Sequence, residues 1–384
     1  MLVTFVIKVS KLCNLRCSYC YEYPELANPV RMSFEQIAKM FEHLGSYYRA
    51  TAPGAECRFV WHGGEPLLHE PSYYREIFAE QRRCFAGMRA VNWVQTNLTM
   101  LDDERIALLK SEFDGVGVSL DVFGDLRLNV AGRPSQSRVL VNMARLKAAG
   151  ITHGCITVLT KRNLARIEQI FRFYEKIGNS FRILPLFQGA FEQQHLGYEV
   201  TGREVLTALC SVADLWFASN AILHVAPVTD QIRELLRSRA EGYEPVYYDR
   251  RTQESVVLVN TNGDLYGQAD AYDTGRSWGN IFHSSMAEIL ESPARQVSVL
   301  EAEARMASAC LRCRYFGTCN GFPVAENRRR YEDTIHEGRV ECVVERGLFQ
   351  HLERRLTEAE HQFGDGIWQR LASRLGDAEA QAQI

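Results

Sequence analysis

The 384-residue sequence lacks the features that mark membrane proteins and nucleic-acid-binding proteins. It has no run of about 18 apolar residues, so no membrane-spanning helix is expected. Its 44 Lys and Arg against 47 Asp and Glu leave a net charge of −3, and no basic cluster would attract nucleic acid or a lipid surface. The apolar start lacks the basic segment and the small-residue cleavage site of a signal peptide. We therefore expect neither a nucleic-acid partner nor a membrane partner.

The cysteines give the first positive indication. There are 11 of them, an odd number, and several are clustered in the sequence. This use of cysteine fits metal ligation in the reducing cytosol better than a disulfide framework, so a cytoplasmic protein is expected. The apolar share of 46% and the charged share of 24% are those of an ordinary globular protein, and the length allows two domains.

Strand-like and helix-like segments alternate through the first half of the chain. Short β-rich runs occur at Val3–Ser10, Cys57–His62, Val91–Thr96, Val116–Asp121, Cys155–Leu159 and Phe181–Phe187. Helical patterns separate them, at Phe34–Tyr48, Tyr74–Cys84, Asp103–Ser111, Ser137–Ala149 and Ile167–Ile177. Ser33 and Gln36 form a capping-box pattern before the first helix. This repeated βα unit predicts an α/β fold with a parallel sheet, whose chemistry lies at the carboxyl ends of the strands.

The pattern changes near residue 188. Helical segments are followed by a β- and turn-rich stretch, in which Asn262-Gly263 is a hairpin signal, and then by a cysteine-rich stretch and an amphipathic tail. We predict three parts, namely a βα domain over residues 1–220, a β-hairpin and helical domain over residues 221–345, and a helical tail over residues 346–384.

Three cysteines lie directly after the first predicted strand, at Cys13, Cys17 and Cys20. Three thiolates on one loop can hold a metal centre, but they cannot complete a tetrahedral site or a four-iron cluster. One metal then stays open to a donor from outside the protein. The alternative is an incomplete zinc site or a chance grouping.

The spacing Cys13-x3-Cys17-x2-Cys20, with aromatic Tyr19 before the last cysteine, resembles the radical S-adenosylmethionine (SAM) superfamily. The resemblance implies a partial (βα)6 barrel of the TIM type, and a [4Fe–4S] cluster on the three cysteines. It also implies that SAM binds the open iron. One electron from the reduced cluster then cleaves SAM to a 5′-deoxyadenosyl radical, which abstracts a hydrogen from the substrate.

The segment Gly63-Gly64-Glu65-Pro66 follows the second predicted strand and resembles the GGEP motif of this superfamily. The glycines let the backbone approach a ligand closely, and a carboxylate can pair with an ammonium group. The resemblance therefore implies that these four residues bind the methionyl amine of SAM.

Polar residues at the next strand ends resemble further SAM contacts. Gln95 and Asn97 match a QTNG segment and Ser119 an SLDG segment, although Leu98 and Val122 replace the glycines. We carry over Gln95, Asn97 and Ser119 as SAM contacts and leave Asp121 open. Arg127 follows as a candidate for the SAM carboxylate, with a solvated surface arginine as the alternative.

A second cysteine group consists of Cys310, Cys313, Cys319 and Cys342. Four thiolates suit either structural zinc or a complete [4Fe–4S] cluster. The spacing resembles the SPASM/twitch extension of radical SAM enzymes, which implies an auxiliary cluster. Gln268 stands where a further cysteine is expected in a full SPASM domain. We therefore predict one auxiliary cluster and two [4Fe–4S] clusters in total.

The combined motifs look most like SPASM peptide maturases, in particular the cyclophane-forming group. That likeness implies a C–C or C–heteroatom crosslink in a ribosomally made peptide, with Asp270 as a candidate general base; the alternative for Asp270 is a hairpin aspartate. The runner-up substrate is a small molecule, such as a sugar, nucleoside or amino acid. Sulfatase maturation ranks lower, because those enzymes usually keep two auxiliary clusters. A zinc-binding scaffold is the remote alternative.

The same likeness implies further partners. Reduction of the clusters requires an electron donor such as flavodoxin or ferredoxin. The sequence starts directly at the first strand, so we expect leader-peptide recognition by a separate leader-peptide-binding protein or by another surface.

Overall fold

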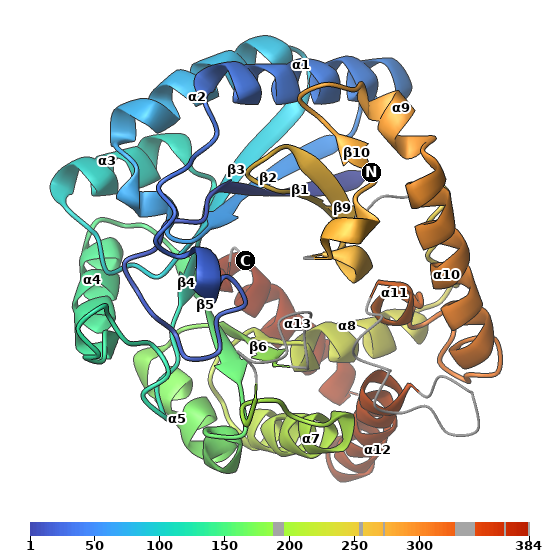
Figure 1. The fold of residues 1–384 in the computed structure, drawn as a ribbon. Coiled ribbons are helices and arrows are strands. Elements are labelled where there is room, and N and C mark those ends of the chain that lie inside the picture. Colours follow the sequence, from blue (N-terminus) through green and yellow to red (C-terminus); the bar gives the residue numbers. More distant parts are fainter. Residues whose placement is uncertain (187–195, 253–255, 272, 327–341, 365, 383–384) are drawn as a thin grey trace. The chain divides into compact units, whose positions relative to one another are not determined.

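The computed structural model describes the following residues: 1–186, 196–252, 256–271, 273–326, 342–364 and 366–382 (Figure 1). They form two compact units, which we describe separately. Unit 1 comprises Met1–Ser119, Arg127–His153 and Arg251–Glu301. Unit 2 comprises Leu120–Leu126, Gly154–Arg250 and Ala302–Ile384. No helix in the described ranges has the length and apolarity needed to cross a bilayer.

The sheet of unit 1 is built around four parallel strands. They are β1 (Leu2–Ser10), β2 (Glu56–Gly63), β3 (Arg89–Thr96) and β4 (Gly115–Ser119), paired in sequence order. Side chains alternate between the two faces, so Phe5 and Phe59, which are paired in register, stack with ring centroids 5.3 Å apart. Both rings are fully buried against the helices.

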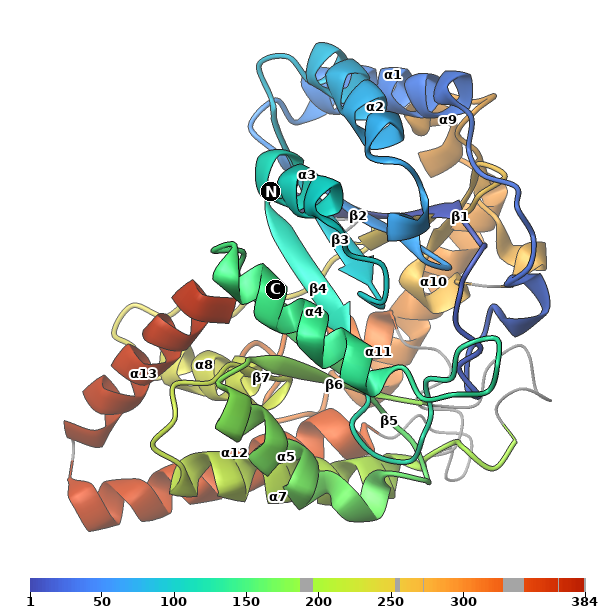
Figure 2. The same cartoon turned by 90° about the vertical axis from the view of Figure 1, so that its left-hand side faces the viewer.

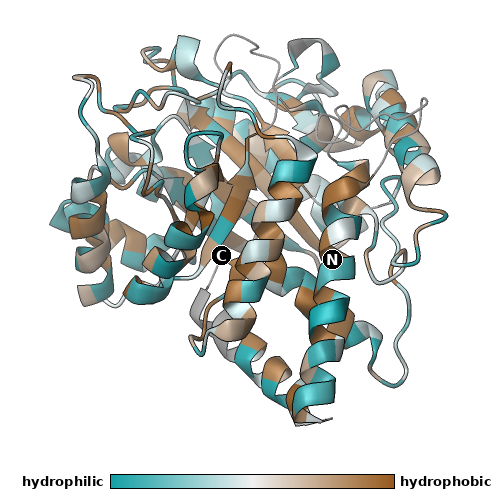
Figure 3. Cartoon of the chain, turned by 90° about the horizontal axis from the view of Figure 1, so that it is seen from below, coloured by the Kyte–Doolittle hydropathy of each residue, from teal (hydrophilic) through white to brown (hydrophobic). Residues whose placement is uncertain are grey.

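Helices follow each of these strands. They are α1 (Phe34–Thr51), α2 (Pro71–Cys84), α3 (Asp103–Glu112) and α4 (Gln136–Ala148), with the short η1 (Tyr23–Glu25) and η2 (Pro66–Leu68) in the loops. The predicted capping box at the start of α1 is present, because Ser33 Oγ accepts from the Gln36 amide while the Gln36 side chain accepts from the Ser33 amide. In Figure 3 the strands are mainly coloured hydrophobic, whereas the helices carry both colours.

The hairpin predicted at Asn262-Gly263 is present, but it belongs to the sheet of unit 1. Strands β8 (Val256–Val259) and β9 (Asp264–Gly267) are antiparallel, and Gly263 adopts a φ of 90° in the turn. Strand β8 then pairs in parallel with β1, and β9 pairs with β10 (Gly279–Asn280). The edge of β1 is thereby covered, which removes an exposed row of backbone hydrogen-bonding groups.

The remaining elements of unit 1 follow this hairpin in the chain. They are η4 (Gln268–Asp270), η5 (Thr274–Arg276), α9 (Met286–Leu290) and the first half of α10 (Pro293–Ala309).

Unit 2 contains the parallel strands β5 (His153–Leu159), β6 (Phe181–Pro185) and β7 (Val225–Ala226). Its helices are η3 (Leu164–Arg166), α5 (Ile167–Ile177), α7 (Gly202–Ala218), α8 (Val228–Ser238), α11 (Phe322–Ala325), α12 (Val343–Phe363) and α13 (Gly366–Ala382). Helix α12 packs along α7, as Figure 2 shows. Tyr174 of α5 stacks on Phe181 of β6, with centroids 4.2 Å apart.

The six strands and five helices expected in the βα region are all present. The differences are small: the fourth strand ends at Ser119 and not at Asp121, and the sixth ends at Pro185. The parallel α/β fold is therefore confirmed. The domain boundaries expected at residues 220 and 345 stay a prediction, and the division into two units does not follow them.

Candidate active site

The loop after β1 carries Cys13, Cys17 and Cys20. Cys17 is buried and the other two are half-buried, and all three are free thiols. The loop is fixed by its backbone, since the Cys13 amide donates to the Leu26 carbonyl at 3.0 Å and the Cys20 amide donates to the Cys17 carbonyl at 3.0 Å. Burial raises the pKa of Cys13 to about 11 and that of Cys20 to about 12, and the adjacent Cys17 adds to both.

Gly63 and Gly64 allow the loop after β2 to approach this cysteine loop. The Gly64 amide donates to the Ser10 carbonyl at 2.9 Å. A Cβ on Gly63, whose φ is 128°, would lie 2.0 Å from that carbonyl oxygen, and a Cβ on Gly64 would lie 2.2 Å from the Leu12 carbonyl oxygen. The close approach that the structure shows is to the backbone leading into Cys13, and contact of these glycines with a ligand stays a prediction.

Glu65 fastens the same loop to the end of β3. One carboxylate oxygen accepts from the Leu67 amide at 2.9 Å and from Thr96 Oγ1 at 2.6 Å, and the other accepts from the Asn97 amide at 2.6 Å. The side chain is only 2% exposed, and burial raises its pKa while these hydrogen bonds lower it. Glu65 therefore already has three protein partners, and an ion pair with an ammonium group would have to form beside them. Pro66, the next residue, is buried at the start of η2.

Asn97 connects the end of β3 with the cysteine loop. Its Nδ2 lies 3.7 Å from Cys13 Sγ and donates to Asn14 Oδ1 at 3.0 Å, and its Oδ1 accepts from Thr99 Oγ1 at 2.7 Å. The next residue, Leu98, adopts a φ of 52°. This left-handed conformation explains why the related segment has glycine there, and here a fully buried leucine side chain occupies the position.

Gln95 and Ser119 form a second polar pair at neighbouring strand ends. Gln95 Nε2 donates to Ser119 Oγ at 2.7 Å. A Cβ on Gly117 of β4 would lie 2.1 Å from Gln95 Oε1, so the Gln95 side chain occupies the space that this glycine leaves. Asp121 lies in unit 2, where its carboxylate accepts from the Val158 amide at 2.6 Å, an interaction that supports the local fold.

Arg127 lies beside the cysteine loop and is half-buried. Its guanidinium nitrogen Nη1 is 3.9 Å from Cys17 Sγ, and its Cζ is 5.9 Å from the centre of the buried Tyr19 ring. The Arg16 amide donates to the Leu128 carbonyl at 2.6 Å, which holds this segment against the loop. A positive charge is therefore available to an anionic metal centre or to a bound carboxylate.

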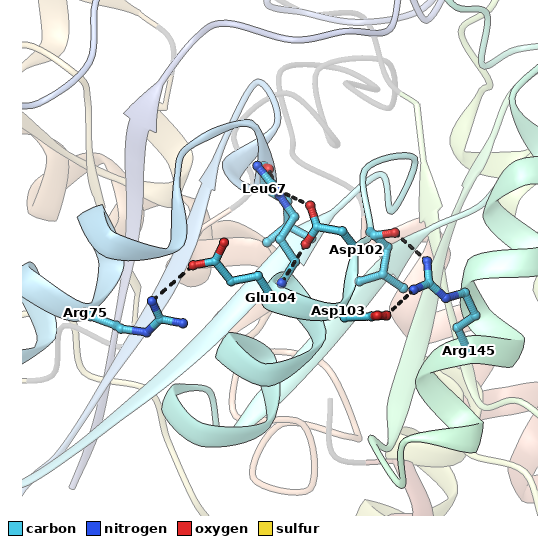
Figure 4. Close-up of polar contacts among 8 residues, drawn as sticks. Leu67, Arg75, Asp102, Asp103, Glu104 and Arg145 are labelled. Carbon is cyan, nitrogen blue, oxygen red and sulfur yellow. Dashed lines mark hydrogen bonds and ion pairs between the residues drawn. The ribbon is translucent and has the colours of Figure 1, made fainter.

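A network around the start of α3 supports the loop after β2 (Figure 4). Arg105, which is 6% exposed, donates through Nε to the Leu67 carbonyl at 2.7 Å and forms an ion pair with Asp102. Asp102 also accepts from the Arg105 amide at 2.8 Å as the cap of α3. The outer pairs, Arg75 with Glu104 and Arg145 with Asp103, are exposed.

The second group of cysteines shares one small cavity in unit 2. Cys310, Cys313, Cys319 and Cys342 all line it, together with Tyr315, Phe316, Phe349 and Glu345. The Cys313 amide donates to the Cys310 carbonyl at 2.8 Å, and the Cys319 amide donates to the Tyr315 carbonyl at 2.7 Å. Burial raises the pKa of Cys310 to about 12 and that of Cys319 to about 11.

Both cysteine groups have the donor chemistry of iron–sulfur sites. Buried thiols resist ionisation, and coordination to iron supplies the positive charge that deprotonates them. Among the residues that the structure describes, no three His, Cys, Asp or Glu side chains meet at the spacing of a single-ion site. In a four-iron cluster the thiolates surround a volume and do not converge on one point, so shared loops and a shared cavity are the relevant fit.

The other four cysteines lie outside both groups. Cys57, Cys84 and Cys155 are buried, whereas Cys210 on α7 is half-buried. None of these four lines the cavity of the second cysteine group.

Asp270 has the surroundings of a structural carboxylate. It is 2% exposed, one oxygen accepts from Arg276 Nε at 2.5 Å, and the other accepts from the Ser298 hydroxyl. Arg276 also pairs with Glu301 at 2.5 Å. A role as a proton acceptor would require one of these donors to release the carboxylate, so the general-base hypothesis gains no support from the geometry.

Sequence reasoning missed several residues that organise the site. Asn14 and Thr99 complete the hydrogen bonds of Asn97, and Arg105 fixes the loop at Leu67. One signal was available: Lys8 is a charged residue inside the otherwise apolar strand of residues 2–9, and it forms a buried ion pair with Glu22.

Comparison with known proteins places these motifs in context. The model of the radical SAM superfamily matches residues 7–174. A serine-type anaerobic sulfatase-maturating enzyme of Bacteroides thetaiotaomicron is 25% identical over 348 residues, which cover 83% of this chain and 82% of that protein. A serine-type enzyme of Klebsiella aerogenes is 33% identical over 147 residues, or 38% of this chain and 35% of that protein.

Solved structures show the same fold. The anSMEcpe structure with bound AdoMet and the Cp18Cys peptide has a TM-score of 0.70 and 19% identity, covering 94% of this chain and 99% of that one. Streptococcus suis SuiB bound to S-adenosylmethionine has a TM-score of 0.54 and 15% identity, covering 83% of this chain and 72% of that one. These likenesses confirm the expected fold. The curated relatives are named as sulfatase-maturating enzymes, whereas the sequence motifs favoured crosslink-forming enzymes over sulfatase maturation.

Proposed function

Because this chain is an enzyme with a radical SAM domain, we propose that it removes a hydrogen atom from a side chain of a ribosomally made peptide or protein. The observation that carries the proposal is the pair of cysteine sites. A three-thiol loop is fixed to the ends of β2 and β3, and a separate four-thiol cavity lies in unit 2. One site leaves an open ligand position, and the other can be ligated completely.

We assign Cys13, Cys17 and Cys20 to the SAM-binding [4Fe–4S] cluster. When bound, this group supplies the electron that cleaves SAM to a 5′-deoxyadenosyl radical. Arg127 provides a guanidinium for the carboxylate of SAM, next to Cys17. The backbone of Gly63 and Gly64 and the Gln95–Ser119 pair form the remaining candidate contacts. Glu65 and Asn97 hold these segments together through hydrogen bonds within the protein.

We assign Cys310, Cys313, Cys319 and Cys342 to one auxiliary [4Fe–4S] cluster. The modification that we propose removes two hydrogens from the peptide: one leaves as an atom to the 5′-deoxyadenosyl radical, and the other leaves as a proton, released to solvent, and an electron. Cys310, Cys313, Cys319 and Cys342 would ligate all four irons of a bound cluster, which would then supply an acceptor for that electron and leave no iron free for the substrate. Zinc in this cavity would stabilise the fold but could not accept an electron.

A peptide substrate is supported by the relatives. Several are named as serine-type or cysteine-type sulfatase-maturating enzymes, and SuiB is described in complex with the precursor peptide SuiA. The product is then either a crosslink, as the motifs suggest, or a modified serine or cysteine, as the relatives' names suggest. We further propose a cytoplasmic enzyme that is reduced by flavodoxin or ferredoxin.

The test uses anaerobically purified protein with dithionite and SAM. Candidate precursor peptides and serine- or cysteine-containing peptides are incubated with it, and products are analysed by tandem mass spectrometry. We expect 5′-deoxyadenosine together with a peptide that has lost two hydrogens, and the fragment ions distinguish a crosslink from a change confined to one residue. Stimulation of 5′-deoxyadenosine release by a sugar or nucleoside, and by no peptide, would contradict the proposal.

A further inference from the structure

Lys8 is an ammonium group buried within the sheet. It lies on β1 in register with His62 of β2, and its side chain is 4% exposed. Removing a charge from water is costly unless a partner compensates, so buried lysines are rare and their partners are informative.

The compensating partner is Glu22, two residues after Cys20. The Lys8 ammonium forms an ion pair with one oxygen of the Glu22 carboxylate, which is 6% exposed, and Lys11 Nζ lies 3.8 Å from the other oxygen. The Tyr21 ring lies 4.7 Å from Lys8 Nζ. Burial lowers the pKa of Lys8 to about 8, against the opposing effect of Glu22.

These contacts connect a strand to the last cysteine of the loop. The Tyr23 amide donates to the Cys20 carbonyl at 3.1 Å, so residues 20–23 form one turn that carries both Cys20 and Glu22. The other side of the loop is held differently, since Cys13 is fixed through Leu26, Asn97 and the loop after β2. The Lys8–Glu22 pair is thus a direct side-chain connection between β1 and the turn that carries Cys20.

We propose that Lys8 is a positioning residue for the SAM-binding cluster, holding Cys20 in place through Glu22. The inference rests on the proposed function, because it assumes that Cys13, Cys17 and Cys20 bind a cluster. Lys8 is connected to the turn that carries Cys20 through Glu22, and a positive charge near a cluster favours its reduced state.

The test compares Lys8→Met and Glu22→Gln with the control Lys39→Met. Lys39 also pairs with a glutamate, Glu42, but both side chains are 54% exposed and far along the sequence from the cysteines. Each protein is reconstituted anaerobically. Iron content is measured, and the electron paramagnetic resonance spectrum of the reduced protein is recorded with and without SAM.

We expect Lys8→Met to lose several-fold of the SAM-dependent spectral change and to require a lower potential for reduction of what remains, while the auxiliary-cluster signal is kept. Glu22→Gln should also lose part of the SAM-dependent spectral change, and Lys39→Met should give the spectra of the wild type. If Lys8→Met is insoluble, Glu22→Gln decides by the same readout. If both variants have the spectra and the iron content of the wild type, the inference about Lys8 is wrong and the proposed function stands. If the wild-type protein itself shows no SAM-dependent spectral change, the proposed function is wrong.

Discussion

At the residue scale, the site depends on two positions that have no side chain. Gly63 and Gly64 bring the loop after β2 within hydrogen-bonding distance of Ser10 and Leu12, just before Cys13. Glycine is therefore required at both positions because the neighbouring backbone leaves no room for a side chain. Position 98 differs, because a leucine there adopts a left-handed conformation that glycine would adopt without strain.

Gly64→Val should displace the cysteine loop. The new Cβ would lie 2.2 Å from the Leu12 carbonyl oxygen and 2.3 Å from that of Lys11, and neither backbone can move as a flexible side chain can. We expect strong loss of iron from the SAM-binding site and a free energy of unfolding lower by about 1–3 kcal/mol, as for other overpacked sites. Gly54→Ala is the matched control, because a Cβ there meets no atom within 4 Å. Equal iron content and thermal stability in the two variants would refute this role.

His69 should make the protein sensitive to mild acid. It is 8% exposed at the end of η2, and burial, followed by the charge of Arg31, lowers its pKa from 6.5 to about 4. Between these values the unfolded chain binds a proton that the folded chain does not, so stability falls as pH falls through that window. His69→Gln should reduce the slope of unfolding free energy against pH by up to about 1.4 kcal/mol per pH unit. Substitution of the exposed His361 serves as the control, and an unchanged slope in His69→Gln would count against the assignment.

At the scale of elements, the candidate site residues lie at the ends of four strands, and the sequence predicts each of these strands. Short β-rich runs locate β1 to β4, and the motif residues lie at the last positions of these strands or on the loops directly after them. The sequence does not predict that β8 pairs with β1 or that Glu22 pairs with Lys8. The first contact joins strands far apart in the chain, and the second joins a strand residue to the turn after Cys20. Local periodicity carries no information about such pairs.

Arg105→Gln tests whether α3 supports the loop after β2. The substitution removes a buried hydrogen bond to the Leu67 carbonyl and the ion pair with Asp102 (Figure 4). We expect a loss of about 1.5–3 kcal/mol in unfolding free energy and weaker SAM binding by calorimetry. Arg75→Gln removes only the exposed pair with Glu104, so its effect should stay within about 0.5 kcal/mol. An Arg105 variant as stable as the Arg75 variant would show that the network does not support the loop.

At the scale of the whole molecule, the two cysteine sites belong to different units. Cys13, Cys17 and Cys20 lie in unit 1, and the four cysteines of the second group lie in unit 2. Each site has its own local hydrogen bonds, so loss of one cluster should leave the other in place. We therefore propose separate roles for the two sites: radical generation depends on the first site, and removal of the electron from the peptide depends on the second.

The most direct test measures iron and 5′-deoxyadenosine in parallel for the wild type, Cys17→Ala and Cys313→Ala, all purified anaerobically. The account predicts about eight iron atoms per wild-type chain and about four in each variant. It also predicts no 5′-deoxyadenosine from Cys17→Ala, and continued 5′-deoxyadenosine formation with little modified peptide from Cys313→Ala. Wild-type formation of 5′-deoxyadenosine by Cys17→Ala, or zinc in place of iron in both sites, would contradict it.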